Sequence, residues 1–129
     1  MKPIALAEAT PEARAVLEDI MATRKVPDVN NFWKYLANDP RMLRHVWESL
    51  KEMMGPGALD PLTKELIYVA VSVTNNCEYC MASHNAAARA KGATDAMLAE
   101  VIAVTGLANM TNRLANAYHV PVDDAFKTD

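Results

Sequence analysis

The residues best suited to chemistry lie close together, between Asn76 and His84. The chain has only two cysteines, Cys77 and Cys80, and His84 follows the second of them by four residues. On a helix, a three-residue step turns about 300° and rises about 4.5 Å, so the two sulfurs would share a face at disulfide distance. A disulfide closing so short a loop stabilises a fold by only about 2 kcal/mol, which suits a redox cycle better than a structural role. The spacing therefore indicates a thiol redox centre.

Further residues can activate these thiols. A helix that begins near Cys77 would place its partial positive charge beside the sulfurs and favour the thiolate, which is the nucleophile. One turn beyond Cys80, His84 can take its proton directly or through one water. Glu65 joins them only if residues 75–76 reverse the chain, because antiparallel helices would bring Glu65 level with His84. A carboxylate there would orient the imidazole and hold its proton.

Other interpretations of these residues stay open. The two cysteines could simply pack as small hydrophobic side chains. A metal site is another alternative, since two thiols, an imidazole and a carboxylate are all possible ligands. Structural zinc usually takes more sulfur, however, and the chain has no second CxxC. Taken alone, Glu65 would be a solvated helix residue, and neither His45 nor His119 has neighbours that suggest a site.

The composition limits the class of protein. A chain of 129 residues fits one domain, and its net charge of −3 without a basic stripe gives no reason to expect nucleic acid or a membrane surface as partner. No apolar run approaches the ~20 residues of a membrane span. The N-terminus lacks the apolar core of a signal peptide, so we expect the cytoplasm, where thiols stay reduced unless they cycle.

The sequence predicts helices along the whole chain. Three expected helices begin where a capping residue precedes a proline, and a fourth where a threonine precedes an acidic residue: Thr10-Pro11, Asp39-Pro40, Asp60-Pro61 and Thr94-Asp95. Together with the apolar spacing they predict helices over about 11–24, 32–36 with Asn31 as its cap, 40–54, 61–74, 77–91 and 95–118. The alternating Val69, Val71 and Val73 would also suit a strand, but the preceding residues fit the helical period. We therefore predict an all-α, single-domain bundle of about six helices over 1–129, with its core at about 11–118.

The last predicted helix is apolar over much of its surface. Its large apolar residues exceed what one small domain needs to cover: Met97, Leu98, Val101, Ile102, Val104 and Leu107. An oligomer interface would explain this pattern, and a central helix buried on all sides would explain it equally well.

At these residues the chain resembles the AhpD-like alkylhydroperoxidase branch of the carboxymuconolactone decarboxylase family. That branch is marked by a glutamate, a CxxC twelve residues later and a histidine four residues past the second cysteine, here Glu65, Cys77, Cys80 and His84. The resemblance extends from about Pro11 to Tyr118. It includes flanking runs that follow the family: Val26-Pro27, Asn38-Asp39-Pro40, Leu59-Asp60, Lys64-Glu65-Leu66 and Asn112-Arg113-Leu114. The family's best-known members have a histidine between the cysteines, where this chain has Tyr79.

The resemblance implies a thiol-dependent hydroperoxide reductase without a cofactor. Cys80 would attack the hydroperoxide and become a sulfenic acid, Cys77 would resolve it as a disulfide, and His84 and Glu65 would relay protons. The expected partners are a hydroperoxide, a dithiol or protein reductant, and further copies of the chain, as a hexamer first and a trimer second. A metal-binding or non-catalytic helical oligomer of the same family is the alternative. Decarboxylation is not expected, because the decarboxylases of this superfamily generally lack the cysteine pair.

Overall fold

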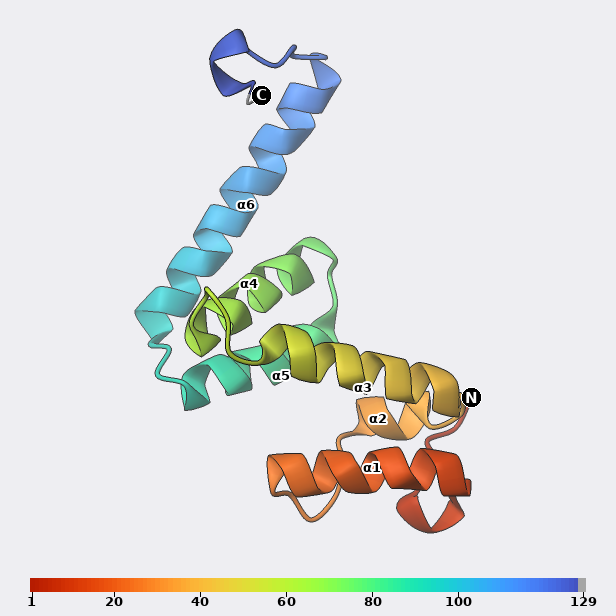
Figure 1. Cartoon of the computed structure of the whole chain (residues 1–129). Helices are drawn as coiled ribbons and strands as arrows, with labels where there is room; N and C mark the ends of the chain where they lie inside the picture. The colour runs from red at the N-terminus through yellow and green to blue at the C-terminus, as the bar shows by residue number, and fades with distance from the viewer. Residues whose placement is uncertain (128–129) are drawn as a thin grey trace. The chain divides into compact units, whose positions relative to one another are not determined.

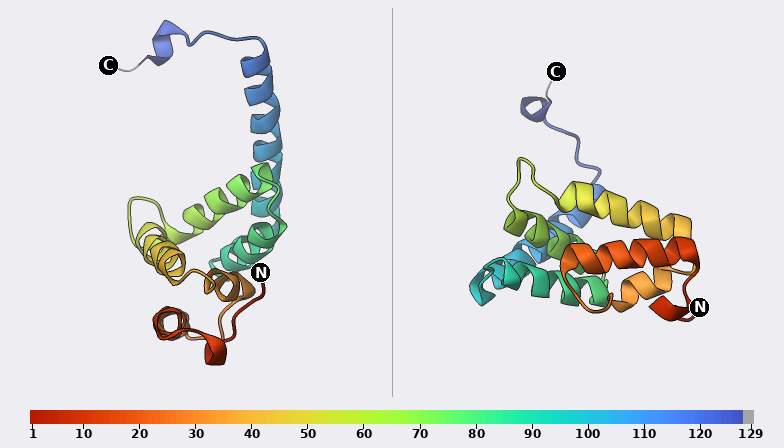
Figure 2. Two further views of the ribbon diagram at one scale, coloured as in Figure 1. Left: turned by 90° about the vertical axis from the view of Figure 1, so that its right-hand side faces the viewer. Right: turned by 60° about the horizontal axis from the view of Figure 1, so that its bottom comes forward.

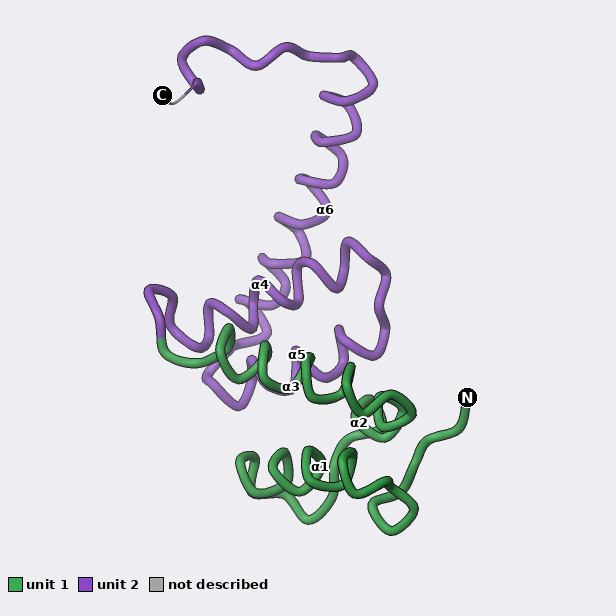
Figure 3. Tube along the Cα trace, turned by 45° about the vertical axis from the view of Figure 1, so that its right-hand side comes forward, with its two compact units in different colours: residues 1–56 green, residues 57–129 purple. Residues whose placement is uncertain are grey.

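The computed structural model describes residues 1–127, and the chain divides into two compact units, residues 1–56 and 57–129 (Figure 3). All regular structure within the described residues is helical (Figure 1). The six α-helices are α1 (Pro11–Arg24), α2 (Asn31–Leu36), α3 (Pro40–Met54), α4 (Pro61–Thr74), α5 (Glu78–Ala90) and α6 (Asp95–Ala117). Short 3₁₀ helices span Leu6–Glu8 and Asp124–Phe126. The predicted all-helical class with about six helices is confirmed, whereas the single domain over 1–129 stays a prediction.

Local side-chain caps explain where four of the helices begin. The side chains of Thr10, Asp39, Asp60 and Thr94 each accept hydrogen bonds from backbone N–H groups in the first turn that follows. These bonds satisfy donors that a helix start leaves without an intrahelical partner. The predicted starts at these four positions are confirmed. The start of α2 differs by one residue from the prediction, because Asn31 is the first residue of the helix and not its cap, and the side chain of the preceding Asn30 makes no capping bond.

The first unit, residues 1–56, has its own core. Its largest buried side chains come from α1, α2 and α3: Leu17, Ile20, Trp33, Leu43 and Trp47. The rings of Trp33 and Trp47 meet edge to face, with centroids 5.5 Å apart. The indole N–H of Trp47 donates to Asp19 Oδ2 at 2.6 Å, so the polar atom of this buried ring is satisfied.

The second unit, residues 57–129, is built on α4, which packs against both α5 and α6. The chain reverses after α4, where Asn76 takes a left-handed conformation with φ 53°. Next to this turn, the backbone N–H of Cys77 donates to the carbonyl of Ser72 at 3.0 Å. Cys77 is the N-cap of α5. It lies just outside the helix, one position before the first turn in which it was predicted.

Helix α6 packs against α4 at least as far along as Asn109. Leu98 and Thr105 are buried, and Asn109 Nδ2 donates to Thr74 Oγ1 at 3.1 Å near the end of α4. Every residue from 110 to 127 is exposed. Figure 2 shows the last turns of α6 continuing beyond α4 and α5. The helix is thus not buried on all sides, which was one of the two explanations for its apolar sequence.

Candidate active site

The centre of the candidate site is Glu65, which lies on the side of α4 that faces α5. Val69 and Ser72 share this face at helical spacing, and both are buried. Glu65 is itself only 5% exposed. A carboxylate so far from water needs hydrogen bonds and opposite charge around it, and its neighbours therefore decide its ionisation.

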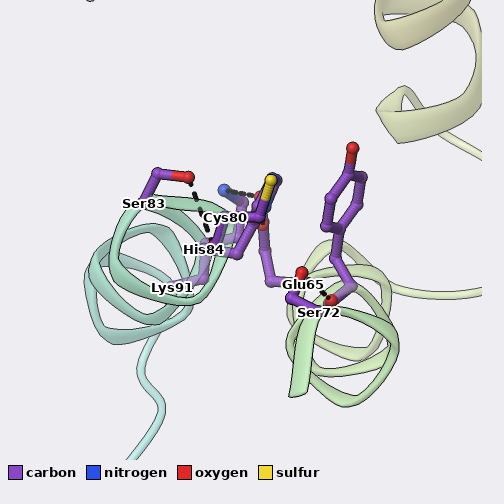
Figure 4. A network of polar contacts seen from close by, with 7 residues as sticks. Glu65, Ser72, Cys80, Ser83, His84 and Lys91 are labelled. Atoms are coloured by element: carbon purple, nitrogen blue, oxygen red, sulfur yellow. Dashed lines mark hydrogen bonds and ion pairs between the residues drawn. The ribbon is translucent and has the colours of Figure 1, made fainter. Parts of the chain in front are cut away.

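Helix α5 and the residue that caps its C-terminus supply a separate partner to each oxygen of this carboxylate (Figure 4). His84 Nδ1 lies 2.7 Å from Glu65 Oε2, and Lys91 Nζ lies 2.9 Å from Glu65 Oε1. Burial alone would raise the pKa of Glu65, but the hydrogen bonds from His84 and Lys91 outweigh it and the pKa is lowered. Glu65 is therefore ionised at neutral pH. The antiparallel arrangement that would bring Glu65 level with His84 is confirmed.

The bond to Glu65 fixes the hydrogen positions of His84. An ionised carboxylate only accepts hydrogen bonds, so Nδ1 of His84 carries the hydrogen and donates it. Nε2 is then the ring nitrogen that can exchange a proton with another group. The ring of Tyr68 stacks on the imidazole, with centroids 3.6 Å apart and planes 16° from parallel. His84 is thus held by one hydrogen bond and by one ring face.

Tyr68 also lies within electrostatic range of the two cysteines. Burial, followed by the negative charges of Cys80, Cys77 and Glu65, raises the pKa of its phenol. The phenol therefore keeps its proton at neutral pH. Sequence reasoning missed Tyr68, although its position three residues after Glu65 places both on one side of α4.

The two cysteines are free thiols at the start of α5, and both are half-buried. Interaction with the Cys80 thiol, and then with the Cys80 backbone N–H, lowers the pKa of Cys77. The same interaction with Cys77, together with burial, raises the pKa of Cys80 to about 11. When the pair loses its first proton, that proton therefore leaves Cys77, and the Cys80 S–H supports the resulting thiolate.

His84 lies one turn beyond Cys80. Figure 4 shows the two side chains projecting from the same side of α5, toward Glu65. Within residues 1–127 no direct hydrogen bond joins His84 to Cys80, and Ser83 Oγ contacts the Cys80 carbonyl instead, at 3.3 Å. Helix α5 thus carries both the Cys80 thiol and the His84 imidazole, and one hydrogen bond joins that imidazole to Glu65 of α4.

The remaining candidates contribute nothing to this cluster. His119 is exposed after α6, and His45 is exposed on α3 in the other unit. Across residues 1–127, no three or more His, Cys, Asp or Glu side chains gather closely enough to hold a metal ion. None of the described helices combines the length and the apolar character needed to cross a bilayer.

Comparison with known proteins shows the family of the chain. Residues 40–123 match the model of the carboxymuconolactone decarboxylase family. The chain is similar to the crystal structure of the alkylhydroperoxidase AhpD core from Rhodospirillum rubrum, with 57% identity and a TM-score of 0.86 over 92% of this chain and 88% of that one. It is also 43% identical, over 52 residues, to uncharacterized protein 4 in the cox locus of Paracoccus denitrificans. That match spans 40% of this chain and about half of the relative, 47% of its length.

The chain therefore belongs to the carboxymuconolactone decarboxylase family. Within that family it falls in the AhpD-like alkylhydroperoxidase branch, as its Glu–CxxC–His spacing predicted.

Proposed function

We propose that this protein is a thiol-dependent hydroperoxide reductase that uses Cys77 and Cys80 as its redox pair. One observation carries the proposal: the two thiols interact at the start of α5, on the helix whose His84 is hydrogen-bonded to the buried Glu65. A thiolate held beside a second thiol and near an oriented base is the arrangement that reduction of a peroxide requires. The likeness to the AhpD core supports the same chemistry.

The proposed cycle has three balanced steps. The thiolate of Cys80 attacks one oxygen of the hydroperoxide, the O–O bond breaks, and the leaving oxygen takes a proton to become an alcohol. Cys77 then displaces hydroxide from the Cys80 sulfenic acid, which gives a disulfide and water. A dithiol, free or on a protein, reduces that disulfide by exchange and is itself oxidised. The cytoplasm, which is the expected compartment, is reducing and would supply such a donor.

The raised pKa of Cys80 explains why the proposed mechanism needs a group that accepts its proton. Its pKa of about 11 keeps it protonated at neutral pH, so attack by Cys80 requires a base to remove its hydrogen. Cys77 can receive that hydrogen directly, and Nε2 of His84 can receive it through one bridging water. Glu65 would then stabilise the charge that His84 gains, through the hydrogen bond already present at Nδ1.

Mass spectrometry of the intact protein tests the redox chemistry. After one equivalent of a hydroperoxide, we expect the chain to lose two hydrogens and a proteolytic digest to place the new bond between Cys77 and Cys80. Unchanged mass with a full equivalent of metal bound through the thiols would instead support the metal-binding alternative. Unchanged mass with thiols inert to a small alkylating reagent would support the non-catalytic one.

We also propose that copies of the chain associate through α6. The exposed apolar residues Val104, Leu107, Met110, Leu114 and Tyr118 lie on the side of α6 opposite Leu98 and Thr105, which contact α4. Between Ile102 and Val122 the chain carries only one Lys, Arg, Asp or Glu residue, Arg113. A face this apolar suits a second copy of the same chain, and the resemblance favours a hexamer, then a trimer.

The oligomeric state of a variant tests this surface. Sedimentation should give about six, or failing that about three, times the chain mass of 14.1 kDa. The double variant Leu107→Asp, Leu114→Asp should sediment as a smaller species, because two buried charges oppose association. Asn112→Asp, about 160° around the helix from Leu114, is the matched control and should leave the mass unchanged. A monomeric wild-type protein would contradict the proposal.

A further inference from the structure

Lys91 contacts Glu65, but the proposed chemistry of the two cysteines gives Lys91 no role. It follows the last residue of α5 as its C-cap, and Gly92 ends the helix with φ 98°. Its amine lies 2.9 Å from Glu65 Oε1, and its side chain is 39% exposed. The side chain of Lys91 therefore extends from a partly exposed position at the end of α5 to a carboxylate that is almost fully buried.

The ion pair differs from its neighbours in how much of it is buried. Arg89 and Asp95 also pair near the end of α5, but their side chains are 54% and 85% exposed. Exposed pairs of this kind contribute little to a fold, because water screens them. The Glu65 side chain is only 7% exposed, so removing the charge that faces it would leave a buried carboxylate with one remaining partner.

The two oxygens of Glu65 have separate tasks. Lys91 occupies Oε1, so Oε2 is the oxygen that receives the Nδ1 hydrogen of His84. A protonated Glu65 would lose that arrangement, since a carboxylic acid can donate its own hydrogen and would no longer require one from His84. The state of His84 therefore depends on the charge of Glu65, and Lys91 helps to determine that charge.

We propose that Lys91 is a positioning residue that keeps Glu65 ionised. The ionised Glu65 in turn fixes the tautomer of His84 that has its hydrogen on Nδ1, so that Nε2 is available to exchange protons. The inference rests on the proposed hydroperoxide reductase, in which His84 acts as the base. Lys91 itself touches no reacting atom. Its effect on the reaction passes through Glu65 and then His84.

The charged and titratable groups around Glu65 are few. Those that act on its carboxylate are His84 and Lys91, both from α5. On α4 itself the phenol of Tyr68 is within electrostatic range. Helix α6 also packs on α4, but its Asp95, Glu100 and Arg113 are exposed. Loss of Lys91 should therefore raise the pKa of Glu65, because burial would then be opposed by His84 alone.

The variant that tests this is Lys91→Met, which keeps the length of the side chain and removes its charge. We expect the carboxyl titration of Glu65, followed by ¹³C NMR, to move upward by about one pH unit or more, as loss of an adjacent opposite charge does. The acid limb of the pH–rate profile for hydroperoxide reduction should move in the same direction. Lys91→Arg should restore both, and Arg89→Met is the matched control that should change neither.

The readouts separate the two proposals. If the wild-type protein reduces no hydroperoxide, the proposed function fails, while the Glu65 titration still decides the role of Lys91. An unchanged Glu65 titration in Lys91→Met overturns the positioning role, whatever the activity. If Lys91→Met does not fold, Lys91→Gln gives the same test with a side chain that can still donate one hydrogen bond.

Discussion

Cys80→Ser is expected to consume no hydroperoxide above the uncatalysed rate, whereas Cys77→Ser is expected to consume one equivalent per chain and then stop. The serine hydroxyl is far less acidic than a thiol, so the first variant has no nucleophile at the attacking position. The second variant forms the sulfenic acid but has no thiol to resolve it. Peroxide consumption per chain and trapping of the sulfenic acid by a 1,3-diketone reagent measure the two outcomes.

A matched control and a contrary outcome make this test decisive. Met81→Leu removes the neighbouring thioether without changing either thiol and should leave turnover intact. A single turnover in Cys80→Ser, with none in Cys77→Ser, would transfer the attack to Cys77, which the lowered pKa of that thiol would explain. Equal and full activity in both variants would reject the dithiol mechanism altogether.

Glu65→Gln should have the second-largest effect. General base catalysis contributes about 10²-fold or more to a rate, and the relay depends on the Glu65 charge, so we expect turnover to fall by roughly that factor. The amide also replaces one accepting oxygen with a donor that faces either His84 or Lys91. A mismatched buried hydrogen bond should lower the free energy of unfolding by about 1–3 kcal/mol. Stopped-flow peroxide reduction and urea unfolding measure the two effects.

The pH dependence of stability gives the sign of the Glu65 contribution. Because folding lowers the pKa of Glu65, the contribution of this group to stability is complete above its unfolded pKa of about 4.5 and is lost as the pH falls through the folded pKa. The stability difference between wild type and Glu65→Gln should therefore be largest near neutral pH and shrink in acid. Glu100→Gln, an exposed change on α6, should show no such difference. A gap that widened in acid would contradict the ionised state of Glu65.

The helices were predictable from sequence because their signals are local. Asp60, Pro61 and the apolar spacing that follows all lie within or next to one helix, and such short-range signals do not depend on the rest of the fold. The same reasoning succeeded for Val69, Val71 and Val73, since the preceding residues set the helical period. The division at residue 56 was not predicted, because a run such as Gly55, Pro56 and Gly57 is typical of any break between two helices and does not by itself mark the boundary of a compact unit.

The candidate site was predictable only in part. Glu65 and His84 could be brought together by counting residues back from a turn, because two adjacent antiparallel helices keep their register near that turn. Lys91 lies fourteen residues past Cys77, at the far end of α5, where the angle between the helices decides which side chain meets Glu65. Sequence alone does not specify that angle. Nor does it specify that the ring of Tyr68 lies flat against the imidazole.

The position of Cys77 at the N-cap of α5 has a consequence for how the protein responds to oxidation. A bond between Cys77 and Cys80 would link the N-cap to a residue of the first turn, and the left-handed Asn76 before it already completes the reversal of the chain. Making or breaking that bond should therefore leave the helices and their contacts in place. Oxidised and reduced molecules would thus present nearly the same surface, and the protein could pass electrons onward without acting as a conformational signal.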